Sequence, residues 1–176
     1  MITNVNFVVM GNLNVTKLNT KKDRANYIHH LLNDIDALDM MIENNMIEEG
    51  PLRIGAEQEF CLVNDQFLPE SRSLELLDAI NDDHFTTEIG NYNLELNLDT
   101  FKLEDDCFSK LHKHLEAYMN KAKRIAAKKG IKIVLTGILP SLSVNNVGEE
   151  SMTDVERYSF LNDAFKQSRR KSFDIH

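Results

Sequence analysis

The sequence predicts an α+β fold, with a largely antiparallel sheet that carries helices on one face, and three observations lead to this prediction. Segments with apolar residues at spacings of three and four, typical of amphipathic helices, alternate with short β-rich segments. Two β-rich segments are separated only by a glycine and an asparagine, which favours an antiparallel pair. No repeat or low-complexity tract divides the 176 residues, so we expect a single domain over residues 1–176.

The N-terminal half contains four predicted elements. Residues 5–18 are β-rich on both sides of a glycine and are expected to form a short hairpin, or an N-terminal strand with a loop. Residues 22–49 are an amphipathic helix that a glycine–proline pair ends. Residues 53–64 are expected to form one strand, and residues 73–80 a short helix.

The C-terminal half continues the alternation. Residues 84–100 read as two strands, the second alternating leucines with polar residues. Residues 104–129 are a long helix with an acidic first turn and a basic last turn, which suits the helix dipole, and residues 131–138 are an apolar strand. A helix is expected over residues 153–166. Residues 171–176 begin to alternate again, so we expect the sequence to be a fragment.

The composition excludes several functional classes. The formal net charge is −8, from 28 acidic against 20 basic residues, so a basic surface for nucleic acid is not expected. The N-terminus lacks a signal peptide or a membrane span, and the two cysteines, Cys61 and Cys107, have neither zinc-site nor disulfide spacing. These features predict a cytoplasmic protein without a membrane partner.

Two glutamates on one predicted strand are candidate metal ligands. Glu57 and Glu59 are two apart, so they project from the same face of a strand, where like charges repel unless a cation lies between them. The surrounding residues are apolar enough to bury much of the strand, and buried carboxylates are rare without a partner. The pair therefore indicates a site for Mg²⁺ or Mn²⁺, with an exposed polar sheet face as the alternative.

A second acidic strand repeats this pattern. Glu95 lies among alternating leucines, and Glu88 precedes it across the predicted turn at Gly90. If the two acidic strands are neighbours, their glutamates form one carboxylate cluster. A solvated outer face of an antiparallel sheet is the alternative.

Motifs for serine hydrolysis and for a phosphate-binding P-loop are missing from the sequence.

Three segments together resemble a known family. R-I-G-A-E-Q-E-F at residues 53–60, T-E-I-G-N-Y-N-L-E-L-N at 87–97 and T-G-I-L-P at 136–140 are similar to the N-terminal part of the catalytic domain of glutamate-cysteine ligase family 2. Members are bacterial carboxylate-amine ligases with a glutamine synthetase-like fold. Many members have G-T-H-P where this chain has Gly137-Ile138-Leu139-Pro140, so no histidine role is carried over.

The resemblance also implies roles for single residues. Arg157 and Tyr158 resemble an arginine–tyrosine pair of the family and would contact substrate or phosphate, with a helix-surface arginine beside a half-buried tyrosine as the alternative. No catalytic residue is assigned. By matching position, the metal ligands would be Glu57, Glu59, Glu88 and Glu95.

The implied activity is an ATP-dependent ligation. The γ-carboxylate of glutamate would be joined to an amine such as that of cysteine through an acyl phosphate, as in glutathione biosynthesis. ATP would be the co-substrate and Mg²⁺ or Mn²⁺ the metal, the partners would be small molecules, and a homo-oligomer is left open. The 176 residues alone are expected to be inactive as a ligase, with little or no turnover. A noncatalytic binding or regulatory module and a carboxylate-metal phosphohydrolase are the alternatives.

Overall fold

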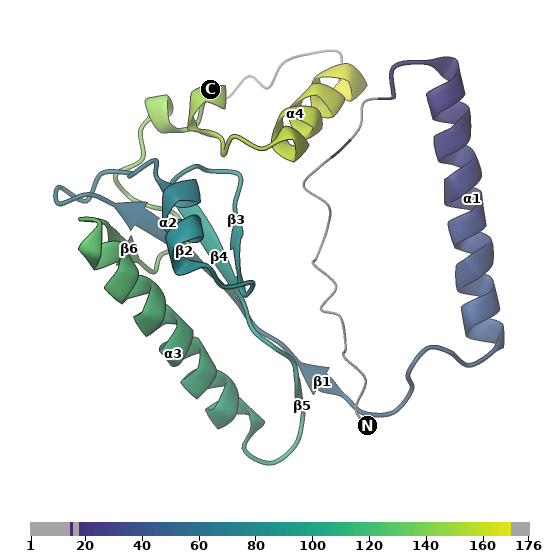
Figure 1. Cartoon of the computed structure of the whole chain (residues 1–176), viewed down its shortest axis with the longest axis horizontal. Helices are drawn as coiled ribbons and strands as arrows, with labels where there is room; N and C mark the ends of the chain where they lie inside the picture. The colour runs from purple at the N-terminus through teal and green to yellow at the C-terminus, as the bar shows by residue number, and fades with distance from the viewer. Residues whose placement is uncertain (1–14, 16–17, 170–176) are drawn as a thin grey trace. The chain divides into compact units, whose positions relative to one another are not determined.

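The computed structural model describes residue 15 and residues 18–169. The predicted hairpin, apart from residues 15 and 18, and the predicted strand at 171–176 lie outside the described residues. The chain divides into two compact units, Glu48–Thr153 and the flanking segments Met1–Ile47 and Asp154–His176 (Figure 1). One domain over the whole chain stays a prediction.

The unit Glu48–Thr153 contains a four-stranded sheet with the strand order β3-β4-β2-β6. Every neighbouring pair in this sheet is antiparallel, and helices accompany the sheet, which confirms the predicted α+β class. In this order the strands are β3 (Phe85–Thr87), β4 (Asn93–Asn97), β2 (Glu57–Val63) and β6 (Lys132–Val134).

Helices α2 (Ser73–Ile80) and α3 (Cys107–Lys128) cover one face of this sheet, and Figure 1 shows α3 running beside the strands. Their apolar side chains form one core with the alternate residues of β2 and β4, including Phe60 and Leu96, which are both fully buried. Burial of such side chains is the main favourable contribution to folding. The intervening residues of the same strands must therefore face the opposite side of the sheet.

The predicted strand over residues 53–64 is divided in two. β1 (Arg53–Ile54) pairs with β5 (Phe101–Lys102) in a separate two-stranded sheet, whereas β2 pairs with β4 and β6. The break lies at Gly55, where a side-chain carbon would come 3.3 Å from Cγ2 of Thr100. A glycine at this point lets the two chain segments approach closely while β2 enters the other sheet.

Two helices differ from their predicted bounds at their ends. α1 (Lys21–Glu43) stops before residue 49, because the Asn44 side-chain amide donates a 2.7 Å hydrogen bond to the Met40 carbonyl and Asn45 then adopts φ +52°. α3 begins after the acidic residues 104–106, since Asp105 has a left-handed backbone, φ +49°.

The last helix, α4 (Glu156–Arg169), begins three residues after Thr153, where it was predicted to start. Two 3₁₀ turns that were not predicted, Val144–Asn146 and Glu149–Ser151, come before it. Short helical turns of this kind have too few residues to show a hydrophobic period. As a result Thr153 belongs to the extended segment that follows the second turn, and it lies in the same compact unit as the sheet.

Candidate metal centre

The pairing of β2 with β4 brings two predicted ligands together. Glu59 is the direct partner of Glu95 in the antiparallel register, and Glu57 is the partner of Asn97. Side chains of directly paired residues lie on the same face of a sheet, about 4.5–5.5 Å apart at Cβ. This register confirms the prediction that the two acidic strands are neighbours and that their glutamates share a face.

Glu88 joins this pair from the chain segment between β3 and β4. One carboxylate oxygen from each of Glu59, Glu88 and Glu95 can be chosen so that all three lie within 4.8 Å of one another. Such a separation fits oxygen atoms that surround one hard cation at the bond lengths of Mg²⁺ or Ca²⁺, about 2.0–2.6 Å. These residues, Glu59, Glu88 and Glu95, are named the glutamate cluster below.

The glutamate cluster is electrostatically strained. Burial of Glu88, its hydrogen bond with Glu95 and the repulsion from Glu95 and Glu59 raise the pKa of Glu88 to about 7. Carboxyl groups so close together repel one another, so Glu88 binds a proton near neutral pH, where an isolated glutamate would be ionised. A divalent cation would compete with that proton and offset the remaining charge.

The contacts of the described residues give this negative charge no basic partner. Among the side chains that the structure describes, no lysine, arginine or histidine forms an ion pair with the glutamate cluster. Glu95 accepts a 2.7 Å hydrogen bond from the Asn97 side-chain amide, and Glu88 accepts a weak one, 3.3 Å, from the Ile89 backbone amide. Neutral donors orient these carboxylates but do not cancel their charge.

A further oxygen lies on the same sheet face. Asn93 is two residues before Glu95 on β4, and its side-chain oxygen is buried with no hydrogen-bond partner among the described residues. An unsatisfied buried oxygen is costly, and amide oxygens are suitable ligands for hard cations. Both observations fit a divalent cation on this face.

The neighbouring Cys61 is not an activated nucleophile, because burial raises the pKa of its thiol.

The other residues predicted for the site lie outside the glutamate cluster. Glu57 is on the same face of β2, two residue pairs along from Glu59, and its role as a ligand stays a prediction. Arg157 and Tyr158 lie on α4, in the other compact unit, where the arginine is exposed and the tyrosine is buried. Their predicted contact with substrate also stays a prediction.

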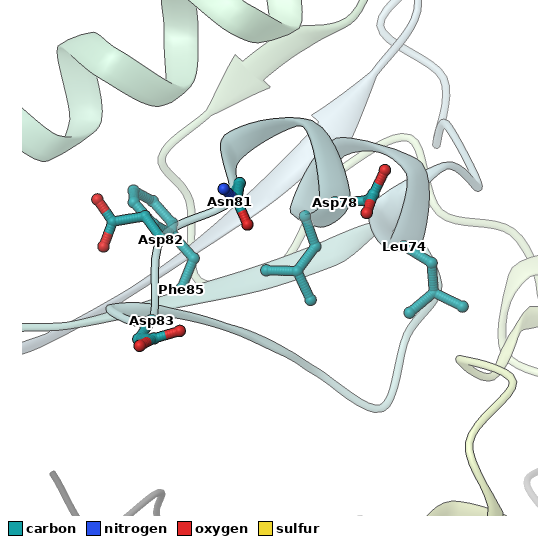
Figure 2. Close-up of a pocket in the computed structure, with 7 residues that line it drawn as sticks. Leu74, Asp78, Asn81, Asp82, Asp83 and Phe85 are labelled. Carbon is teal, nitrogen blue, oxygen red and sulfur yellow. The ribbon is translucent and has the colours of Figure 1, made fainter. Parts of the chain in front are cut away.

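A cavity of about 370 Å³ lies elsewhere, at the C-terminal end of α2 (Figure 2). It contains none of the glutamate cluster, and it is open and acidic. Asp82, on the loop that follows α2, is held by Lys121 at 2.6 Å and by His84 at 2.8 Å, so its charge is already balanced. We assign no ligand to this cavity. Its lining consists of Leu74, Leu77, Asp78, Asn81, Asp82, Asp83 and Phe85.

The raised pKa of Glu88 predicts how stability changes with pH in the metal-free protein. The carboxyl group binds its proton more tightly in the folded state, with a pKa of about 7, than in the unfolded state, where 4.5 is usual. Its contribution to stability is therefore greatest below pH 4.5 and is lost as the pH rises to about 7. Glu88→Gln should remove this loss.

Urea unfolding in EDTA at about pH 5 and about pH 8 measures the effect. The fall in unfolding free energy between the two pH values should be smaller in Glu88→Gln than in the parent. Glu116→Gln, a substitution at an exposed position of α3, should leave the fall unchanged. An identical pH dependence in the parent and in Glu88→Gln would show that Glu88 does not hold a proton at neutral pH.

Comparison with known proteins identifies the family. The family model of glutamate-cysteine ligase family 2 matches residues 53–171, more than half of the chain, and the match includes the whole glutamate cluster. Comparisons with curated proteins and with solved structures gave no match. Membership supports an enzyme of the ligase type, in a group that joins carboxylates to amines. The chain belongs to glutamate-cysteine ligase family 2.

Proposed function

We propose that this chain carries the metal site of an ATP-dependent ligase that joins the γ-carboxylate of glutamate to an amine such as that of cysteine. The observation that supports the proposal is the glutamate cluster, three carboxylates within 4.8 Å on one sheet face, inside the region that matches the ligase family. The expected reaction begins with attack of the γ-carboxylate on the γ-phosphorus of ATP, which forms an acyl phosphate and releases ADP. The amine then attacks the acyl carbon, loses a proton and displaces phosphate, which leaves the amide.

The charges of the reactants explain why such an enzyme needs a carboxylate cluster. A carboxylate that attacks the γ-phosphate of ATP approaches a group that is already negative. Mg²⁺ or Mn²⁺, when bound, supplies positive charge that offsets this repulsion and fixes the phosphate oxygens. In this chain Glu59, Glu88 and Glu95 would hold the cation. Asn93 offers a neutral oxygen beside them, and Glu57 adds negative charge on the same face.

The proposed role of the glutamates is to bind metal, and none of them acts as a general base. Because the pKa of Glu88 is raised to about 7, a cation would compete with a proton for this carboxylate near neutral pH. The proposal keeps small molecules as the partners and the cytoplasm as the location. Within the described residues, no helix combines the length and the apolar composition that crossing a membrane requires.

A hydroxylamine assay tests the proposed reaction. Hydroxylamine replaces the amine and traps an acyl phosphate as a hydroxamate. With ATP, Mg²⁺ and glutamate, we expect hydroxamate to form slowly in the parent chain and to fall to background in Glu95→Gln. Omitting glutamate should give the same background, because the carboxylate is the group that becomes phosphorylated.

The two alternatives give different results in this assay. A phosphohydrolase would release phosphate from ATP at the same rate with and without glutamate and hydroxylamine. A binding module would consume no ATP under any condition. Glutamate-dependent hydroxamate above the Glu95→Gln background is the result that only the ligase predicts, and phosphate release that does not depend on glutamate would overturn the proposed function.

A further inference from the structure

The position of Glu88 depends on a chain segment far away in the sequence. Residues 149–153 lie against the turn that carries Glu88, with Met152 in an isolated antiparallel bridge to Gly90. The Asn91 amide donates a 2.8 Å hydrogen bond to the Ser151 carbonyl, and the Thr153 amide donates one of 2.7 Å to the Ile89 carbonyl. The turn is therefore paired to this segment along much of its length.

Thr153 adds a side-chain contact directly to the ligand residue. Its hydroxyl donates a hydrogen bond of 2.5 Å to the backbone carbonyl of Glu88, and only 2% of the residue is exposed. A buried hydroxyl without an acceptor is costly, so this bond resists any rotation of the Glu88 peptide group. Together with the amide of the same residue, the hydroxyl fixes two successive carbonyl groups at the glutamate cluster.

Contacts from α2 and from the first 3₁₀ turn hold the rest of the turn. The Ser73 amide donates a 3.1 Å hydrogen bond to the Asn91 carbonyl, and the Tyr92 hydroxyl donates one of 3.2 Å to the Asn146 carbonyl. These bonds hold the far end of the turn, at residues 91–92. At the ligand residue itself, Thr153 supplies the side-chain bond to the backbone.

We propose that Thr153 is a positioning residue for the metal centre, and that its hydroxyl holds Glu88 within reach of Glu59 and Glu95. This inference rests on the proposed function. Mutual repulsion among the three carboxylates favours rotation of Glu88 away from the others in the metal-free protein. The bond from Thr153 fixes the backbone from which the Glu88 side chain projects and so opposes displacement of the turn, which keeps the carboxylate near the other ligands.

Thr153→Val tests the inference, because it removes the hydroxyl at nearly constant shape and keeps the backbone amide. We expect Mn²⁺ affinity to fall by about 10-fold or more, the effect typical of groups that orient metal ligands. Hydrogen exchange of residues 88–91 in the metal-free protein should become faster. Thr153→Ser, which keeps the hydroxyl, should restore both values to near those of the parent.

Thr20→Val is the matched control. The Thr20 hydroxyl caps α1 in the other compact unit by accepting a 3.0 Å hydrogen bond from the Asp23 amide. Its loss should lower the melting temperature without changing Mn²⁺ affinity. If Thr153→Val does not fold, the smaller Thr153→Ala replaces it with the same expectations.

The outcomes separate this inference from the metal centre itself. If the parent binds Mn²⁺ and Thr153→Val binds it with equal affinity, the positioning role of Thr153 is overturned and the metal centre stays intact. A melting temperature that falls while affinity and exchange at residues 88–91 stay constant would show a merely structural role and would also overturn it. If the parent binds no Mn²⁺, the metal centre fails, and the positioning role fails with it.

Discussion

Glu95→Gln is expected to weaken Mn²⁺ binding by more than about 100-fold, beyond the 10–100-fold typical of residues that only orient ligands. Glu95 is the central member of the glutamate cluster, since it pairs directly with Glu59 across the strands and hydrogen bonds with Glu88. The substitution keeps the size of the side chain and removes its charge. Isothermal titration calorimetry with Mn²⁺ gives the affinity of the parent and of the variant.

The same variant should behave differently without metal. Removing one charge relieves repulsion within the cluster, so metal-free Glu95→Gln should be at least as stable as the parent. Mn²⁺ should raise the melting temperature of the parent by mass action and leave that of the variant unchanged. Glu116→Gln removes an exposed charge on α3 and should keep the full metal-induced shift. Equal shifts in the parent and in Glu95→Gln would exclude Glu95 as a ligand.

Leu96→Ala is expected to have the largest effect on stability, about 2–5 kcal/mol. Leu96 follows Glu95 on β4 but faces the helices, where it is fully buried in the core with Phe60 and Phe85. Truncation removes buried apolar surface and leaves a cavity that the surrounding side chains fill only in part. Urea unfolding of the metal-free proteins measures the loss.

Adjacent residues on opposite faces should thus give opposite results. Leu96→Ala should lower stability strongly while the folded protein retains its Mn²⁺ affinity. Glu95→Gln should keep the stability of the metal-free protein and lose Mn²⁺ affinity. The loss of stability in Leu98→Ala can be compared with that in Leu96→Ala, since Leu98 is slightly exposed and lies just beyond β4. A cost below about 0.5 kcal/mol for Leu96→Ala, the size of an ordinary surface substitution, would contradict the division of the sheet into an apolar and an acidic face.

The two faces of the sheet were predictable because apolar and polar residues alternate between neighbouring positions of a strand, and this pattern is visible in the sequence. Leucines at positions 94 and 96 and polar residues at 93, 95 and 97 determine which side of β4 enters the core. The same reasoning placed Glu57 and Glu59 together on β2. Glu88 was a candidate because it precedes Glu95 across the predicted turn at Gly90, and the family resemblance supported it. The alternation alone could not place its side chain, because Glu88 lies beyond the end of β3.

Contacts between distant segments were not predictable in this way. Whether Glu59 lies opposite Glu95 depends on the register of two strands, and a shift by one residue would have placed the carboxylates on opposite faces. The bond from Thr153 to Glu88 joins residues 65 positions apart. Thr153 was predicted as the start of a helix, whereas it lies in the extended segment before α4.

The central claim is that Glu59, Glu88 and Glu95 together bind a divalent cation. Its most direct test is an anomalous difference map from crystals of the protein grown with Mn²⁺. We expect a single strong peak within about 2.0–2.6 Å of a carboxylate oxygen from each of the three glutamates. An ordered glutamate cluster with no peak beside it at saturating Mn²⁺, or a peak bound only by other residues, would contradict the account.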